Sequence, residues 1–574
     1  MKNSTASAAE TLDPLVHAAW ARANASLSPM SSLLAWIDWA SHLAVSPGKR
    51  LDLWQLALTQ ANEHIANLAP RQQGSQDSST KPDGRFADPA WDQWPFSVWR
   101  QHFLDSQRWW EQATQGVKGV DPHHQNLVAF WARQWLDMLS PGNLPFTNPV
   151  VWRRTREEGG VNLIRGLTYM LEDMQRVLTD QPQHGTENFV VGRDVAVTPG
   201  KVVFKNELME LIQYAPTTET VHAEPILVVP AWIMKYYILD LSPHNSLIKY
   251  MVDQGYTVFC ISWVNPGPEL RDMGMDDYLE LGFRAALNAV NAIVPNRKVH
   301  ATGYCLGGTL LASGAAAMAR DGETERLASL TLFAAQTDFS EPGELGLFID
   351  ESQVTLLEAQ MNRAGCLRAE QMAGAFQMLR SYDLLWSRLV NEYLLGERRS
   401  MFDLMAWNAD ATRMPAKMHS QYLRRLFLND ELSEGRYQVD GRAVSLGDLA
   451  WPVFAVGTLT DHVAPWRSVY RLSHLTSAEL TFVLTSGGHN AGIVSEPGRP
   501  RRNYRIHTRP EGGLYLPPEE WAEYADHKDG SWWPEWDAWL SRRSSAQVKP
   551  PRMGAPSKGY KVLGDAPGVY VTQK

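Results

Sequence analysis

The sequence predicts an α/β catalytic domain that follows a mainly helical N-terminal domain. Up to about residue 190, apolar residues recur at helical spacing. Beyond that point, short β-branched runs alternate with helical segments, a pattern typical of a parallel sheet with crossover helices. The 574 residues are enough for two folded parts. We therefore predict domains over 1–190 and 191–574.

The N-terminal part shows helical spacing most clearly over Leu33–Leu43 and Val161–Val177. A polar stretch with glycine and serine, Arg71–Gly84, is typical of a linker or a long loop. Twelve of the 23 tryptophans precede residue 153. Such aromatic density favours helix packing over a docking surface, although aromatic residues serve both.

The predicted sheet consists of a hairpin-like pair and six further strands, whose limits are accurate to a few residues. In chain order these segments are Val202–Tyr214 for the pair, then Pro225–Pro230, Tyr256–Ile261, Lys298–Thr302, Ala328–Ala334, Pro452–Val456 and Glu479–Leu484. The long helical stretch between the strand that ends near Ala334 and the strand that starts near Pro452 far exceeds an ordinary connection. We expect this insertion, about 337–440, to form a cap over the active site.

Charge and cysteine content exclude several classes of protein. The formal charge of -9 comes without basic blocks, so nucleic acid is not an expected partner. The three cysteines, Cys260, Cys305 and Cys366, argue against a disulfide framework and fit a reducing compartment. No histidine, cysteine or acidic cluster has metal-ligand spacing, so we expect no metal.

Two further features bear on location. The first ten residues lack a charged region followed by an apolar stretch, which argues against a secretory signal. The longest apolar run, Ile226–Met234, covers nine residues, whereas a membrane span needs roughly 18. We therefore expect a cytoplasmic protein without a transmembrane segment, attached at most peripherally to a lipid-like phase.

Cys305 lies in a Gly-x-Cys-x-Gly motif between a β-rich stretch and a helix of small residues. This arrangement is the nucleophile elbow of the α/β-hydrolase type of domain, with cysteine in place of serine. Gly303 and Gly307 would remove clashes of the strained turn with the neighbouring strand and helix. A buried structural cysteine is the alternative, and the strand-turn-helix context favours the nucleophile. Thr309 and Leu310 stand where a phosphate-binding loop requires lysine and serine or threonine, so no such loop is expected.

The acid and base of a catalytic triad follow in the order this fold requires. Asp461 follows the predicted strand Pro452–Val456, and His489 follows the next one. A loop aspartate is often only a turn residue, but both residues lie at the sheet edge where open α/β sheets bind ligands. His462 is the rival base, ranked lower because a strand and a helix normally separate acid and histidine.

A tetrahedral oxyanion needs preorganised N–H donors. The backbone N–H of Leu306, directly after the nucleophile, is the predicted first donor. The loop after Pro225–Pro230 is predicted to supply the second, from Ile233 or else Trp232.

Six segments resemble the polyhydroxyalkanoate synthases, in particular the single-subunit, class I-like poly-3-hydroxybutyrate synthases. In the family's order along the chain they are Lys235–Leu241, Gly303–Gly308, Trp407–Thr412, Asp461–Trp466, Gly488–Gly492 and Gly530–Trp536. The resemblance extends from about Phe86 to Trp539. Leu306 and Asn490 depart from the valine and isoleucine that are common in the family.

The resemblance implies an acyltransferase whose catalytic residues fall on Cys305, Asp461 and His489. Such an enzyme polymerises (R)-3-hydroxyacyl-CoA into polyester through a covalent cysteine thioester and releases coenzyme A. The nucleophile motif that contains Tyr304 resembles that of synthases that prefer short-chain monomers such as 3-hydroxybutyryl-CoA. No cofactor is implied, because coenzyme A is part of the substrate.

The resemblance also implies a homodimer bound to polymer granules, with phasin-type proteins as further partners of the N-terminal domain. Two alternatives stay open. A thioesterase or polyester depolymerase would share the fold and the triad, although cysteine and the large helical domain argue against it. A non-catalytic granule-associated protein is disfavoured by the intact set of catalytic residues.

Overall fold

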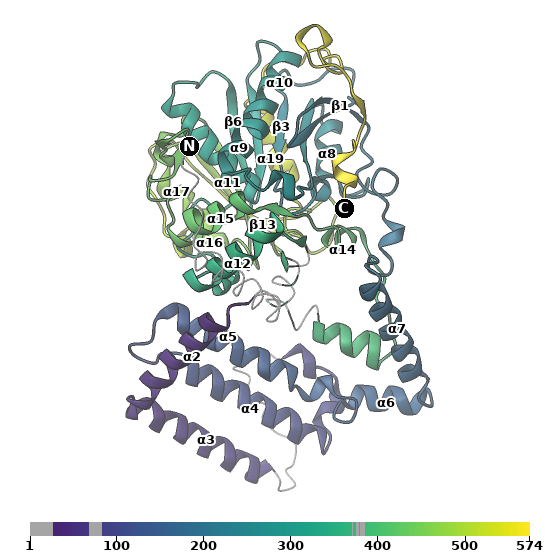
Figure 1. Cartoon of the computed structure of the whole chain (residues 1–574), viewed down its shortest axis with the longest axis vertical. Coiled ribbons are helices and arrows are strands. Elements are labelled where there is room, and N and C mark those ends of the chain that lie inside the picture. Colours follow the sequence, from purple (N-terminus) through teal and green to yellow (C-terminus); the bar gives the residue numbers. More distant parts are fainter. Residues whose placement is uncertain are drawn as a thin grey trace, which may run out of the picture. The chain divides into compact units, whose positions relative to one another are not determined.

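The computed structural model describes residues 27–67, 83–369 and 385–574, with a few separate residues between 370 and 384. The chain divides into two compact units (Figure 1). The helical unit comprises described residues of 27–184 and 374–400, and the α/β unit comprises 185–373 and 401–574. Each unit is considered by itself.

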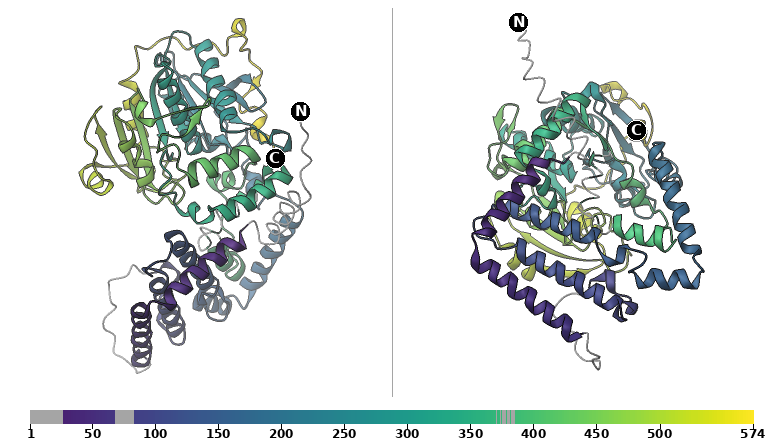
Figure 2. Two further views of the ribbon diagram at one scale, coloured as in Figure 1. Left: turned by 60° about the vertical axis from the view of Figure 1, so that its left-hand side comes forward. Right: turned by 60° about the horizontal axis from the view of Figure 1, so that its bottom comes forward.

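Helices α2 to α5 lie side by side in the helical unit (Figure 2). The unit's main helices are α2 (Pro29–Ala44), α3 (Pro47–Asn67), α4 (Phe96–Thr114), α5 (Pro122–Met138), α6 (Pro149–Glu157) and α7 (Val161–Leu178). Side chains cap several of them: Asp121 accepts hydrogen bonds from the first turn of α5, and Asn148 from that of α6. Proline follows each of these caps, where its missing N–H costs nothing.

The segment 374–400, which lies within the predicted cap, belongs to the helical unit. Arg388 and Arg398 from this segment pair with Asp173 of α7 at 2.6 and 3.1 Å. A Cβ atom at Gly166 of α7 would lie 1.9 Å from the carbonyl oxygen of Tyr393. Only glycine therefore permits this approach, and it fixes the segment against α7.

The α/β unit is built on an eleven-stranded mixed sheet of order β14-β13-β12-β11-β6-β5-β3-β4-β2-β1-β15. The strands are β1 (Gly200–Lys205), β2 (Met209–Tyr214), β3 (Ile226–Val229), β4 (Val258–Trp263), β5 (Val299–Tyr304), β6 (Leu327–Phe333), β11 (Val453–Thr458), β12 (Leu480–Thr485), β13 (Asn503–Arg509), β14 (Asp526–Asp529) and β15 (Gly564–Asp565). The six from β4 to β12 pair in parallel, and antiparallel strands extend both edges. The predicted fold class is confirmed.

Each predicted strand is present, but three edge strands were not predicted. The parallel strands are apolar and buried on both faces, which makes their runs easy to recognise. In contrast, β13 is only partly buried, and all four residues of β14 and both of β15 are exposed. Polar edge strands lack the apolar run or alternation on which a prediction depends.

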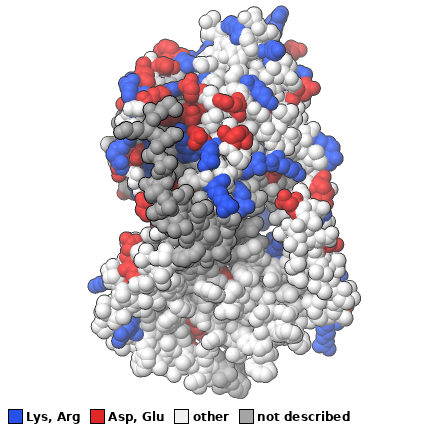
Figure 3. Space-filling view, in the orientation of Figure 1, with Lys and Arg blue, Asp and Glu red and all other residues white. Residues whose placement is uncertain are grey.

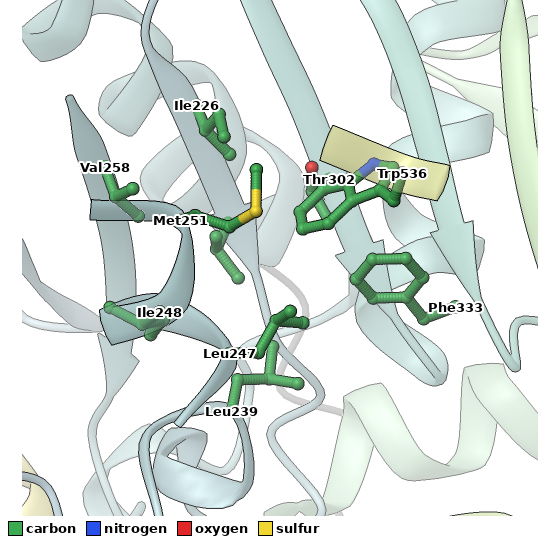
Figure 4. A pocket seen from close by; sticks show the side chains of 10 residues that line it. Ile226, Leu239, Leu247, Ile248, Met251, Val258, Thr302, Phe333 and Trp536 are labelled. Carbon is green, nitrogen blue, oxygen red and sulfur yellow. The ribbon is translucent and has the colours of Figure 1, made fainter. Parts of the chain in front are cut away.

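Helices cover both faces of the sheet and enclose two apolar cores. One core includes side chains of α10 (Ala285–Ile293) and α11 (Leu306–Arg320). The other includes α8 (Leu247–Asp253) and α19 (Trp533–Ser541). Figure 4 shows a small apolar pocket in this second core, where Leu247 and Trp536 face strand side chains. The Trp536 indole N–H donates to the Thr331 hydroxyl at 3.0 Å, so its polar atom is satisfied.

Asp240 is a buried carboxyl group in this second core, at the end of η5 (Tyr236–Asp240). The hydroxyls of Thr198 and Ser246 donate to its Oδ1 at 2.5 and 2.6 Å. Burial raises the pKa of Asp240 to about 6, although these hydrogen bonds oppose the shift. Asp240, from one of the six family-like segments, therefore braces the fold through these hydrogen bonds.

Replacement of Asp240 by asparagine should change how stability depends on pH. The folded-state pKa of about 6 exceeds the unfolded value of about 3.9, so the native state binds the proton more tightly. Stability from this group is therefore lost as the pH rises from about 4 to about 6. Relative to Asp240→Asn, we expect the wild type to lose about 2–3 kcal/mol between pH 4 and pH 8.

Denaturant unfolding at a series of pH values measures this difference. Asp526→Asn, on the exposed strand β14, is the matched control and should keep the wild-type pH dependence. Equal pH slopes for wild type and Asp240→Asn would contradict the prediction.

Candidate active site

Cys305 occupies the turn between β5 and α11. Its backbone has φ 51° and ψ −126°, a region that non-glycine residues rarely adopt. Hydrogen bonds hold it there: its N–H donates to Phe333 O at 2.8 Å, and its carbonyl accepts from the N–H of Gly308 at 2.8 Å. The half-buried thiol contacts both apolar cores. The backbone thus presents the thiol at the carboxyl end of the parallel strands.

Glycines allow the helix to start this close to the sheet. A Cβ atom at Gly303 would lie 2.4 Å from the Cα of Gly308. One at Gly307 would lie 2.2 Å from the carbonyl oxygen of Val229 in the neighbouring strand. Both contacts are with backbone, which has little freedom to move aside. The predicted reason for the glycines therefore agrees with the packing.

Asp461 follows β11 and is held by four hydrogen bonds. Its Oδ1 accepts the N–H groups of Val463 and Ala464, both at 2.9 Å. Its Oδ2 accepts the Thr458 hydroxyl at 2.7 Å and lies 2.8 Å from Nδ1 of His489. Burial opposes ionisation, but the charge of His489 and the hydrogen bonds outweigh it and hold the pKa of Asp461 below its usual value.

His489 follows β12 and links the acid to the thiol. Burial lowers its pKa, but the charges of Asp461 and Cys305 and a side-chain hydrogen bond to each raise the pKa well above the usual value. Asp461 pairs with the imidazole ring of His489. For His462, the alternative base, the backbone carbonyl accepts the N–H of Glu344. The structure brings Cys305, His489 and Asp461 together in the predicted order.

The loop after β3 carries Trp232 and Ile233, the two candidates for the second N–H donor to the oxyanion. Two side chains hold this loop by hydrogen bonds. The Thr412 hydroxyl lies 2.6 Å from the carbonyl oxygens of Trp232 and Ile233. The Trp407 indole N–H donates to the carbonyl of Lys235 at 2.8 Å. Trp407 and Thr412, at the two ends of one family-like segment, therefore support this loop. Leu306 opens α11 directly after Cys305.

Lys235 anchors the same loop through its side chain. The buried amine donates to the carbonyls of Val571 and Gln573 at 2.6 and 2.8 Å and pairs with Asp410 at 3.0 Å. Burial lowers the pKa of this amine, although Asp410 opposes the shift. These three oxygen partners match the three N–H donors of a lysine, so the amine of Lys235 has its full set of hydrogen bonds.

Arg502 is a supporting residue that sequence reasoning missed. Its guanidinium donates to the carbonyls of Ser486 at 3.0 Å and Ala491 at 2.7 Å, on either side of His489. It thus ties the two ends of the histidine loop together. It lies outside every recognised motif, and no spacing rule pointed to it.

Two kinds of site are absent from the described residues. Within the described ranges, no group of three or more histidine, cysteine or acidic side chains could hold a metal ion. In the same part of the chain, no helix combines the length and apolar character that a bilayer crossing requires.

Family models match most of the chain. Residues 82–251 match the model described as poly-beta-hydroxybutyrate polymerase (PhaC) N-terminus, and residues 7–49 match poly-beta-hydroxybutyrate polymerase N terminal. Residues 224–496 match the alpha/beta hydrolase fold.

Curated relatives are similar over more than four fifths of their length. The poly(3-hydroxyalkanoate) polymerase of Methylorubrum extorquens is 43% identical over 86% of this chain and 81% of its own. The poly(3-hydroxyalkanoate) polymerase subunit PhaC of Rhizobium meliloti is 39% identical over 91% and 84%, and that of Cupriavidus necator 37% over 86% and 83%. Among solved structures, a monoacylglycerol lipase of Paleococcus ferrophilus matches 49% of this chain and 90% of its own, at 11% identity and a TM-score of 0.31.

Replacement of Gly307 by alanine tests the close packing at the nucleophile turn. The added methyl group would lie 2.2 Å from the Val229 carbonyl, so α11 must shift away from the sheet. We expect a loss of about 1–3 kcal/mol in the free energy of unfolding and a large loss of activity. Gly48→Ala in α3, where nothing lies within 4 Å of the new Cβ, is the control. A Gly307→Ala protein with wild-type stability and activity would refute the packing role.

Proposed function

The chain belongs to the poly(3-hydroxyalkanoate) polymerase family, and from this premise we propose that it polymerises (R)-3-hydroxyacyl-CoA through a covalent thioester on Cys305. The preferred monomer is short, such as 3-hydroxybutyryl-CoA, and coenzyme A is released. The observation that supports this proposal most is the chain of contacts from Cys305 through His489 to Asp461. Family membership supports the substrate class.

In the first step, His489 accepts the proton of Cys305 and the thiolate attacks the thioester carbonyl. The backbone N–H groups of Leu306 and Ile233 are the proposed donors to the oxyanion. The carbon–sulfur bond to coenzyme A then breaks, and His489 returns the proton to the leaving thiolate. An acyl group on Cys305 and free coenzyme A result.

In the second step, His489 accepts the proton of a hydroxyl group, on a bound monomer or on the growing chain end. The hydroxyl oxygen attacks the thioester, an ester bond forms, and the thiol of Cys305 is regenerated with the proton from His489. Asp461 orients the imidazole and balances its charge. Cysteine suits this cycle because exchange between two thioesters is nearly thermoneutral and leaves the acyl group activated for transfer.

Water competes with the hydroxyl, so polymerisation requires a dry site. Two observations support such a site. Cys305 packs against both apolar cores. Tyr422, at the start of η11 (Tyr422–Leu428), is buried, and burial and the charge of Cys305 raise the pKa of its hydroxyl. Tyr422 therefore supports the proposal that the parts of the predicted cap within the α/β unit lie over the thiol.

The helical unit is the proposed site of attachment to polymer granules in the cytoplasm. Helix α7 leaves a row of apolar side chains exposed, namely Ile164, Leu167, Leu171, Met174 and Leu178. They recur every three or four residues and form one face, which suits an apolar polyester surface. Figure 3 shows few charged groups over the helical unit on the face in view. A homodimer and phasin-type partners are also proposed, from family membership alone.

The first test uses the purified chain with (R)-3-hydroxybutyryl-CoA, measuring free thiol release and then insoluble polyester against free 3-hydroxybutyrate. We expect polymer from the wild type and at least about a 10³-fold lower rate from Cys305→Ala, since the nucleophile is lost. Cys366→Ala, at a cysteine in β7 (Cys366–Leu367), is the matched control and should stay active. Free acid in place of polymer would favour a thioesterase, and no turnover would refute the assigned chemistry.

The granule proposal has its own test. Leu167→Glu together with Met174→Glu adds two charges to the apolar face of α7, so we expect at least a severalfold lower granule-bound fraction. Gln55→Glu with Thr59→Glu adds the same charges at exposed polar positions of α3 and should have little effect. Sedimentation of granules with each protein measures the fraction. Equal binding of the α7 variant and the wild type would exclude this face.

A further inference from the structure

We infer that the hydrogen bond between Tyr304 and Asn490 positions His489 against Cys305, which makes both residues positioning residues of the reaction. This inference rests on the proposed function of Cys305 and His489. Tyr304 directly precedes the proposed nucleophile, and Asn490 directly follows the proposed base. A bond between them therefore joins the two loops whose alignment the chemistry requires.

Tyr304 contacts both Asn490 and His489. The Tyr304 hydroxyl donates to Oδ1 of Asn490 at 2.6 Å. The ring centroids of Tyr304 and His489 are 5.7 Å apart, with 34° between the planes. Tyr304 thus touches the imidazole with its ring and holds the next residue with its hydroxyl.

Burial keeps the Tyr304 hydroxyl protonated, so it can donate to the side-chain oxygen of Asn490. Tyr304 is 3% exposed, and burial, with the charges of Cys305 and Asp461, raises the pKa of its hydroxyl well above the usual value. The hydroxyl therefore keeps its proton at any pH at which the enzyme works. Asn490 provides an acceptor that carries no charge beside the imidazole.

The backbone of Asn490 is also held, so its side chain is a firm point of attachment. Its carbonyl accepts the N–H groups of Ile493 at 3.1 Å and Val494 at 2.9 Å. Its Nδ2 lies 3.5 Å from Oδ1 of Asn408, the last residue of α14 (Asp403–Asn408). Arg502 holds the histidine loop through main-chain carbonyls, whereas Tyr304 links that loop to the nucleophile turn itself.

Loss of the link should leave Asp461 paired with His489 but free the histidine loop to shift relative to Cys305. Small misplacements of a general base are costly, because proton transfer requires hydrogen-bond reach.

The test compares Tyr304→Phe, Asn490→Leu and the double variant in the full chain. The rate of Cys305 alkylation by iodoacetamide is followed by mass spectrometry of the Cys305 peptide, at pH 7 and in short pulses at pH 10. We expect each single variant to react about tenfold more slowly at pH 7, where the thiol needs its base. Little change is expected at pH 10, where a thiol ionises without help.

Turnover supplies the second readout. The value of kcat should fall about tenfold in each single variant with KM within about twofold of wild type. The double variant should be no slower than the worse single variant, because both changes remove the same bond. Tyr256→Phe removes a buried hydroxyl that donates to Asp537 O and should match the wild type in both assays.

Unchanged alkylation at pH 7 in both single variants, or multiplicative losses in the double variant, would overturn the inference. Failure of the proposed function looks different. In that case Cys305→Ala would retain polymer formation, or the wild type would form none. Variants that are active but slowed equally at both pH values would also overturn the inference, since that pattern reports altered access to the thiol.

Discussion

The close approach of α11 to the sheet at Cys305 is the constraint on which the rest of the site depends. Glycine at 303 and 307 removes the Cβ atoms that would meet backbone at 2.4 and 2.2 Å. The strained turn then places the thiol where β11 and β12 also end. Because these strands are parallel, the loops that follow them reach the same edge, and Asp461 and His489 can meet Cys305.

Electrostatic interactions stabilise the charged forms of Asp461 and His489. Burial alone would disfavour both charges of the Asp461–His489 pair. The four hydrogen bonds to Asp461, of which His489 makes one, reverse this, since they lower the pKa of the acid and raise that of the base. Such a pair holds the imidazole in one orientation, with Nδ1 toward Asp461 and the other nitrogen free to serve the thiol.

Much of this architecture could be predicted from sequence, because the buried parallel strands are continuous apolar runs and the elbow has its own motif. The three candidate catalytic residues follow from the strand order. In contrast, β13, β14 and the role of 374–400 could not be predicted, since polar edge strands and a salt bridge to Asp173 leave no local pattern. Lys235 acts on main-chain carbonyls that are distant in sequence, and Arg502 on carbonyls of a neighbouring loop, and no motif encodes such contacts.

In the proposed mechanism, a hydrolase and a polymerase of this fold would form the same acyl-enzyme, so the difference would lie in what reaches the thioester. The thiol of Cys305 lies between two apolar cores, and the ring of Tyr304 covers one side of His489. Little polar surface is then available to hold an attacking water. A hydroxyl at the end of an apolar polyester brings its own contacts with such walls, whereas water does not. In the proposed mechanism, selection of the acceptor would thus depend on the apolar lining more than on the three catalytic side chains.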